Sequence, residues 1–355
     1  MKVLFAGLGA IGQRHLRNLH ALLGDALEVA AYRVRRQTAV VTERLELDAG
    51  ASVEEKYGVR VFDALEEGLE RFRPEAVFVC NPTNLHVPVA LAAARAGAHL
   101  FIEKPLGADL EGADELARLV EERGLVALVG FQMRFHPAFR RLRELVEDEA
   151  LGPLLAVRAR YGEYLPDFHP YEDYRQSYAA REALGGGVIR TQIHDLDYLL
   201  ALFGMPARVF ALGGHLSALE IDVEDVASIA LDCRRYGRQL PVHLHQDFVT
   251  RPPERRCTVI GEEGIVEVDF RAPELVRRGP HGEIAERFEP AGFERNAMFL
   301  DLLRHFLASI EGRERPVVGI ADAILRQRVA LAARASISHG RAVDPMDLES
   351  SGGAR

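Results

Sequence analysis

With 355 residues, the chain is long enough for about two domains. Its net charge of −9, without any run rich in Lys and Arg, excludes a typical nucleic-acid-binding protein. Its apolar stretches are shorter than the ~20 residues that span a bilayer. Its cysteines, Cys80, Cys233 and Cys257, are too far apart for a disulfide framework or a structural zinc site. We therefore expect a cytoplasmic protein that binds neither nucleic acid nor membrane.

The first third of the chain alternates between short apolar runs and amphipathic stretches. The run at 76–80 is continuously apolar, which is typical of a strand buried on both faces. Alternation at this spacing predicts βαβ units and a parallel sheet. We predict strands at 2–6, 27–32, 59–62, 76–80, 100–102 and 126–129, and helices at 12–23, 87–96 and 110–122.

The pattern changes after residue 131, where longer runs separated by Gly and Pro turns predict an antiparallel sheet. The predicted fold class is α/β, with an N-terminal Rossmann domain (1–130) and a C-terminal α+β domain with a large, mostly antiparallel sheet (131–343). The second domain would bind substrate and form oligomers, and the tail at 344–355 would be disordered. The second domain has predicted strands at 154–164, 207–216, 225–233, 241–248, 257–260 and 264–270, and helices at 137–147, 194–203, 293–311 and 321–338.

Three glycines, Gly7, Gly9 and Gly12, lie between the first predicted strand and the first predicted helix. Their spacing allows a tight turn, close approach of the main chain to a pyrophosphate, and close packing of helix on strand. The helix N-terminus, with Ala10 and Ile11, supplies N–H groups and a positive dipole for phosphates. An ordinary turn could have the same spacing, but this context predicts a dinucleotide site.

Basic residues follow the second predicted strand, where an NAD-specific site usually has an Asp or Glu. The chain has Arg33 and Arg36 there, and guanidinium groups suit a 2′-phosphate. We therefore predict NADP(H) as the cofactor, with NAD(H) as the alternative. The alternative is that these arginines only reflect a general preference for arginine over lysine, since only three of the 44 basic residues are lysines.

Two further segments follow buried strands, at the edge where open α/β sheets bind ligands. Lys104 lies between such a strand and a proline, a position from which it could polarise a sugar hydroxyl beside a nicotinamide. A surface lysine at a turn is the alternative. The first segment contains Asn81, Pro82, Thr83 and His86, and the second contains Glu103, Lys104 and Pro105.

Taken together, these segments resemble the glucose–fructose oxidoreductase/inositol dehydrogenase (Gfo/Idh/MocA) family. The resemblance covers almost the whole chain and includes the glycine loop, both strand-end segments, the segment 131–137, and Gly185-Gly186-Gly187 followed by His194. It implies a sugar or cyclitol oxidoreductase in which Lys104 is catalytic and Pro105 follows a cis peptide bond. It also implies cofactor contacts from Asn81, Pro82, Thr83, His86, Glu103 and Lys104.

The segment before His194 departs from the family pattern, which has an Asp, three residues and then the His. Counted back from His194, the Asp position holds Arg190; counted forward from the glycines, it holds Thr191. With that carboxylate missing, His194 is the leading general acid or base, because its ordinary pKa of about 6.5 suits proton transfer at neutral pH. Asp195 or Asp197 would orient it or pack elsewhere. A purely structural histidine is the alternative.

A long loop at 165–178 combines aromatic and charged side chains, which suit polyhydroxylated ligands. An arm at a dimer interface is the alternative. The loop faintly resembles enzymes of bacterial surface-sugar synthesis, which implies an amino sugar or a nucleotide-linked sugar as substrate. The predicted substrate-binding residues are Gln132, Arg134, Tyr164, Tyr174, Arg175, Arg190, Gln192 and His194.

The predicted function is NAD(P)-dependent hydride transfer at a hydroxyl-bearing carbon of a sugar. Two rivals remain: a cofactor-binding regulator of the same fold, and an NAD-assisted glycoside-cleaving enzyme. His243 and His245 share one face of a predicted strand but lack a third ligand, so no metal site is predicted. The broad second sheet suggests a homodimer or a homotetramer.

Overall fold

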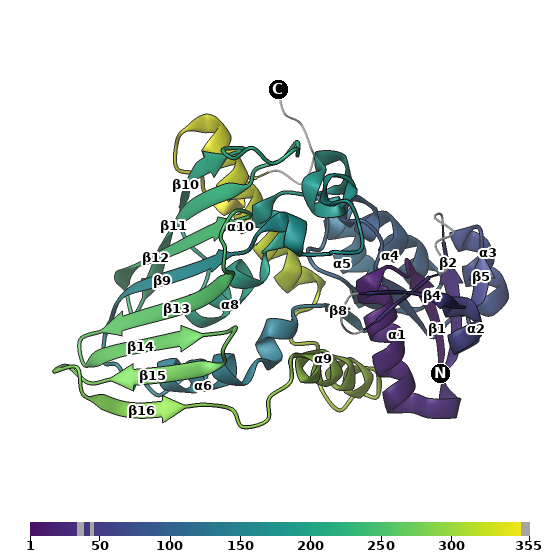
Figure 1. Cartoon of the computed structure of the whole chain (residues 1–355), viewed down its shortest axis with the longest axis horizontal. Helices are drawn as coiled ribbons and strands as arrows, with labels where there is room; N and C mark the ends of the chain where they lie inside the picture. The colour runs from purple at the N-terminus through teal and green to yellow at the C-terminus, as the bar shows by residue number, and fades with distance from the viewer. Residues whose placement is uncertain (34–38, 43–45, 349–355) are drawn as a thin grey trace.

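The computed structural model describes residues 1–33, 39–42 and 46–348, and two large sheets dominate it (Figure 1). The first has six parallel strands in the order β5-β2-β1-β6-β7-β8. The strand order reverses between β1 and β6, which makes that position the topological switch point where open sheets bind ligands. The strands are β1 (Lys2–Ala6), β2 (Glu28–Tyr32), β5 (Arg60–Phe62), β6 (Ala76–Val79), β7 (His99–Ile102) and β8 (Ala127–Val129).

Helices cover both faces of the parallel sheet, so its central strands are buried on both sides. Val3 of β1 lies in one apolar cluster and Leu4 lies in the other. The cluster around Val3 includes Phe306 of α9 (Arg295–Ile310), so a helix from late in the chain completes the core of the first half. The predicted Rossmann fold is confirmed, and the boundaries 1–130 and 131–343 stay a prediction. The remaining helices around this sheet are α1 (Ala10–Leu23), α3 (Leu65–Phe72), α4 (His86–Arg95) and α5 (Ala113–Glu122).

A small hairpin and a short helix follow β2 and lie outside our predicted elements. The strands β3 (Ala39–Val41) and β4 (Leu47–Ser52) pair antiparallel, and α2 (Val53–Tyr57) follows directly. Ser52 caps α2 by accepting a hydrogen bond from the main-chain N–H of Glu55. These elements are too short and too polar to produce a clear hydrophobic period.

The second sheet has eight strands in the order β10-β11-β12-β9-β13-β14-β15-β16. Its neighbours are antiparallel except for β12 and β9, so the predicted mostly antiparallel sheet is confirmed. The last two strands extend the sheet beyond our prediction. The strands are β9 (Leu154–Gly162), β10 (Val209–Gly214), β11 (Val226–Arg235), β12 (Arg238–Asp247), β13 (Glu254–Gly261), β14 (Gly264–Asp269), β15 (Glu274–Arg278) and β16 (Ile284–Phe288).

Three helices, α6 (Pro137–Glu147), α8 (His194–Phe203) and α10 (Ile320–His339), pack on one face of this second sheet (Figure 1). Burial alternates along β12, where Val242 and Leu244 are buried and His243 between them is exposed. Helices therefore cover one face of the sheet, while the other face carries the exposed side chains.

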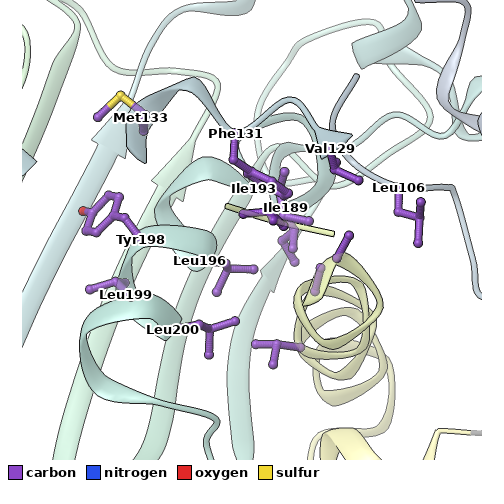
Figure 2. Close-up of a cluster of buried hydrophobic side chains, with 14 of the residues drawn as sticks. Leu106, Val129, Phe131, Met133, Ile189, Ile193, Leu196, Tyr198, Leu199 and Leu200 are labelled. Atoms are coloured by element: carbon purple, nitrogen blue, oxygen red, sulfur yellow. The ribbon is translucent and has the colours of Figure 1, made fainter. Parts of the chain in front are cut away.

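An apolar cluster around α8 joins the two halves (Figure 2). Ile189, Ile193 and Leu196 lie in the same cluster as Val129 at the end of β8 and Phe131 just beyond it. The backbone around His194 is therefore held by packing from both halves of the molecule, as a site built between two domains requires.

The predicted long loop and tail contain short turns. The segment 165–178 forms 3₁₀ turns at Leu165–Asp167 and Tyr174–Gln176. In the predicted tail, Pro345–Asp347 forms another turn, and Arg328 donates to the carbonyl oxygen of Leu348. Residues 344–348 are therefore structured, unlike the predicted disordered tail, and 349–355 lie outside the described residues.

All three cysteines, Cys80, Cys233 and Cys257, are buried and free. Within the described ranges, the helices are too short or too polar to cross a membrane.

Candidate functional site

The three glycines after β1 differ in whether the fold has room for a side chain at their position. Gly7 has a φ of 98°, and a Cβ there would lie 2.8 Å from the carbonyl oxygen of Cys80. A Cβ at Gly12 would lie 2.5 Å from the carbonyl oxygen of Gly7. Gly9 has a φ of −69°, which any residue adopts, and a Cβ there would meet no atom of the described residues within 4 Å. The fold itself therefore requires glycine at 7 and 12, whereas Gly9 keeps space open beside the helix.

The N-terminus of α1 faces this open space. The helix begins at Ala10 without a side-chain cap, and no acidic residue lies in its first turn. The first main-chain N–H groups, including that of Ile11, have no partner within the helix. Free N–H groups and a positive dipole beside an open glycine fit the pyrophosphate of a dinucleotide.

The basic side chains after β2 are placed differently from our prediction. Arg33 is buried and forms an ion pair with Glu54 in the first turn of α2. Its charge is therefore balanced within the protein. Arg36 lies outside the described residues.

The two predicted strand-end segments lie side by side at the end of the parallel sheet. His86 connects them, because Nδ1 lies 2.8 Å from the carbonyl oxygen of Pro105 and Nε2 lies 2.9 Å from that of Asn81. Burial lowers the pKa of His86, and a neutral ring has one N–H for these two carbonyls. Both ring nitrogens of His86 therefore face main-chain carbonyls, and the ring links the two turns. Pro82 begins the 3₁₀ turn Thr83–Leu85.

Glu103 points into the protein rather than toward a ligand. Its Oε1 lies 2.7 Å from Nε2 of His15, a fully buried residue of α1. Burial alone would raise the pKa of Glu103, but the hydrogen bond to His15 and the charge of Lys104 hold it below its ordinary value. This pair fastens the turn that carries Lys104 to the helix that carries the glycine loop.

Lys104 reaches across to the second half of the molecule. Its Nζ donates a 2.9 Å hydrogen bond to the carbonyl oxygen of Thr191, at the end of the short helix α7 (Val188–Thr191). The peptide bond between Lys104 and Pro105 is cis, as the family resemblance implied. Thr191, and not Arg190, therefore holds the position beside the lysine.

His194 lies at the start of α8, one turn beyond Thr191. Its Nε2 lies 3.0 Å from Nε2 of Gln132. Burial lowers the pKa of His194 well below its ordinary value, and the positive charges of Lys104 and Arg255 act in the same direction. The imidazole is therefore neutral at neutral pH, the form that accepts a proton.

The two acids after His194 serve neighbouring arginines. Asp195 accepts two hydrogen bonds from Arg255 of β13, at 2.7 and 3.1 Å. Asp197 lies between Arg134 and Arg326, at 2.6 and 3.1 Å. Both acids therefore pack elsewhere, which was one of the two alternatives that the sequence left open.

Several buried polar atoms in these same segments have no hydrogen-bond partner among the residues that the structure describes. They include Nδ1 of His194 and Oγ1 of Thr191, although both residues are almost fully buried. Unpartnered buried polar groups are uncommon and suit a site that hydrogen-bonds a ligand. The others in these segments are Oδ1 of Asn81, Oε1 of Gln132 and Oε1 of Gln192.

The remaining predicted substrate-binding residues contact protein partners. Arg190 is buried and donates to the carbonyl oxygens of Gly186 and Ala108 and to Glu182. Gln192 donates to the carbonyl oxygen of Asp247 at 3.0 Å. The ring of Tyr164 lies beneath the guanidinium of Arg251, and the hydroxyl of Tyr174 accepts from the main-chain N–H of Glu220. Arg175 forms ion pairs with Asp173 and Glu220. Arg134 forms an ion pair with Asp197.

The structure thus brings together Lys104, Gln132, Gln192 and His194, and it adds residues that the sequence did not single out as site residues. Thr191 was noted only as one place for the missing Asp. Gln246 of β12 donates to the carbonyl oxygen of Gln192 at 2.7 Å, and with polar residues on both sides it gave no signal in the sequence. In the described part of the chain, no three His, Cys, Asp or Glu side chains are grouped to hold a metal ion.

Comparison with known proteins agrees with this geometry. Residues 1–131 match the oxidoreductase family with an NAD-binding Rossmann fold, GFO/IDH/MocA, and residues 139–267 match the GFO/IDH/MocA C-terminal domain. The chain is 28% identical over 348 residues to myo-inositol 2-dehydrogenase of Thermotoga maritima, covering 97% of this chain and 98% of that one. It is 31% identical over 263 residues to UDP-N-acetylglucosamine 3-dehydrogenase of Acidithiobacillus ferrooxidans, covering 74% and 73%.

Among solved structures, the fold is similar to that of the WlbA dehydrogenase from Bordetella pertussis in complex with NADH and UDP-GlcNAcA. The TM-score is 0.76 at 21% identity, over 97% of this chain and 98% of that chain. The comparisons support an NAD-binding domain without supporting a preference for NADP(H). With both halves matched and its motifs in place, the chain belongs to the GFO/IDH/MocA family of oxidoreductases.

Proposed function

We propose that the chain transfers a hydride between a nicotinamide dinucleotide and a hydroxyl-bearing carbon of a sugar or cyclitol. The observation that carries the proposal is the hydrogen bond from Lys104 to Thr191, which places the lysine near His194, together with the glycine loop that suits a dinucleotide. When bound, the cofactor supplies the hydride-carrying C4 atom of the nicotinamide.

Lys104 polarises the substrate oxygen in this proposal. One of its three N–H groups is used by the carbonyl oxygen of Thr191, which fixes the ammonium and leaves two donors. A cation aimed at the oxygen stabilises the negative charge that develops as the proton leaves.

His194 exchanges the proton with the substrate hydroxyl. Burial and nearby positive charge keep its imidazole neutral, so it accepts a proton when the hydroxyl is oxidised. Gln132 contacts Nε2, and Nδ1 has no partner among the described residues. Nδ1 is the nitrogen that accepts the proton when the Gln132 amide is oriented so that its oxygen accepts from Nε2–H. The Thr191 hydroxyl stands where the family pattern has a carboxylate and gives the substrate a neutral donor and acceptor.

The substrate class in this proposal includes nucleotide-linked and amino sugars. Two similar proteins support that choice, a UDP-N-acetylglucosamine 3-dehydrogenase and a dehydrogenase solved with UDP-GlcNAcA. Inositol dehydrogenases are also among the relatives, so free cyclitols belong in the same test. We retain the expectation of a cytoplasmic homodimer or homotetramer, which light scattering on the purified chain would test.

The test is a panel of myo-inositol, scyllo-inositol, UDP-N-acetylglucosamine and its uronic acid, each with NAD⁺ and with NADP⁺. Reduced nicotinamide is followed by its absorbance. Lys104→Met should lower kcat by about 100-fold or more, the scale of losing an electrostatic or acid–base group. Binding of NADH should change little in the same variant, because Lys104 acts on the substrate oxygen.

Lys56→Met is the matched control, since Lys56 is an exposed lysine of α2. It should keep wild-type turnover. Normal NADH binding with no turnover on any member of the panel would refute the proposed function, and full activity in Lys104→Met would refute the role of Lys104.

A further inference from the structure

The adenosine end of the dinucleotide site carries an acid that the sequence pattern does not reveal. Glu54 lies in the first turn of α2, far beyond the ~20-residue spacing at which the ribose-binding acid is usually sought. In the fold, however, its side chain contacts Arg33, the residue directly after β2. The usual position of that acid is the end of β2, so Glu54 reaches the same place from another element.

The end of β2 lies against the glycine loop. The main-chain N–H of Gly7 donates to the carbonyl oxygen of Tyr32 at 3.3 Å, and Ala6 pairs with Tyr32 in the sheet. Arg33 comes next in the chain. Its contact with Glu54 is therefore made beside the loop that suits the pyrophosphate.

The hairpin before α2 is hydrogen-bonded to the helix of the glycine loop. Gln13, which follows Gly12, donates to the carbonyl oxygens of Leu8 and Ala39, both at 3.1 Å. Its Oε1 accepts from the main-chain N–H of Val41 at 2.7 Å. Arg17 donates to the carbonyl oxygen of Val41 at 2.8 Å. These bonds hold the hairpin, and α2 directly after it, beside the cofactor loop.

Only one oxygen of the Glu54 carboxylate has a hydrogen-bond partner among the described residues. Oε1 pairs with Arg33, whereas Oε2 is buried and has no partner among the described residues. A ribose 2′-hydroxyl is a hydrogen-bond donor and would satisfy Oε2. A 2′-phosphate only accepts and would be repelled by the carboxylate, while the charge that could attract it, on Arg33, is already balanced.

We propose that Glu54, held by Arg33, binds the 2′-hydroxyl of the adenosine ribose and selects NAD(H) over NADP(H). This reverses the preference predicted from Arg33 and Arg36 alone. The inference deepens the proposed function by fixing its cofactor. It depends only on dinucleotide binding, so it can be tested whether or not the substrate panel gives turnover.

The experiment titrates NADH and NADPH into the purified full chain and follows nicotinamide fluorescence. The wild type should bind NADH at least tenfold more tightly. Glu54→Gln keeps the size of the side chain and one acceptor oxygen while removing the charge, so the preference should fall at least tenfold. Glu55→Gln is the matched control, because Glu55 is the next residue of α2, is exposed and carries the same charge; it should keep the wild-type preference.

A second measurement needs no variant and so does not depend on how Glu54→Gln folds. Adenosine 5′-monophosphate and adenosine 2′,5′-bisphosphate are compared for their ability to displace NADH from the wild type. Stronger displacement by the monophosphate supports the inference. Stronger displacement by the bisphosphate, tighter binding of NADPH by the wild type, or equal preferences in Glu54→Gln and Glu55→Gln would overturn it.

Discussion

Replacing His136 by Asn should remove a measurable part of the acid sensitivity of the fold. His136 caps α6 by accepting a 3.2 Å hydrogen bond from the main-chain N–H of Ala138, and it is almost fully buried. Burial, together with the charge of Arg255, lowers its pKa to about 4. In the unfolded chain its pKa returns to about 6.5, so below that pH the unfolded state binds a proton that the folded state rejects.

The sign and size of the effect follow from these two pKa values. The folded state is not penalised above pH 6.5, and it loses stability as the pH falls from 6.5 toward 4. Between pH 8 and pH 5 the loss from His136 alone is about 2 kcal/mol. An Asn at this position can still cap the helix, because its side-chain oxygen accepts the same hydrogen bond.

The assay is denaturant unfolding of the wild type and His136→Asn at pH 8 and at pH 5. Other histidines titrate equally in both proteins, so the difference between the two pH-dependent losses isolates His136. The wild type should lose about 2 kcal/mol more than the variant between pH 8 and pH 5. Equal losses would refute a depressed pKa for His136, and a larger loss in the variant would refute the sign.

Three further predictions concern the site. Because the pKa of His194 is depressed, the acid limb of the pH profile of kcat/KM for hydroxyl oxidation should lie below about pH 6.5; a limb at or above that value would contradict the neutral buried imidazole. Gly9→Ala should fold normally, since its Cβ meets no atom in the described part of the chain, yet bind NADH at least tenfold more weakly in a fluorescence titration; unchanged affinity would remove the pyrophosphate from this position. Thr191→Val keeps the carbonyl that holds Lys104 but loses the hydroxyl, so kcat/KM should fall at least tenfold and recover in Thr191→Ser; equal activity of the Val and Ser variants would exclude the hydroxyl.

The sequence predicted the sheets well because their signals are strong and local. The apolar run at 76–80 is buried on both faces in β6, and the helix predicted at 194–203 has the bounds observed for α8. The hairpin β3–β4 and helix α2 escaped prediction because elements of three to six residues bury too little apolar surface to show a period.

Only some of the predicted site residues lie together in the structure, and the reason is a matter of long-range contacts. Lys104 and His194 lie close together because Lys104 follows β7 and His194 begins α8, and the fold brings these two ends together. Arg134 and Arg190 have the chemistry of substrate-binding residues, but their guanidinium groups are held by Asp197 and Glu182. Sequence alone gives the chemistry of an arginine and not its partner. The partner of Arg33 is likewise a long-range contact, made by a helix that lay outside the prediction.

The short helix α7 has a consequence for how the molecule moves. Lys104 and Arg190 each make one hydrogen bond between α7 and the turn that follows β7, the first to Thr191 and the second to Ala108. Swinging the two halves apart would break both bonds, at about 1–1.5 kcal/mol each and more for charged donors. A cost of about 3 kcal/mol corresponds to an open population below about 1%. The two halves are therefore expected to stay in contact at α7 in about 99% of molecules at any moment.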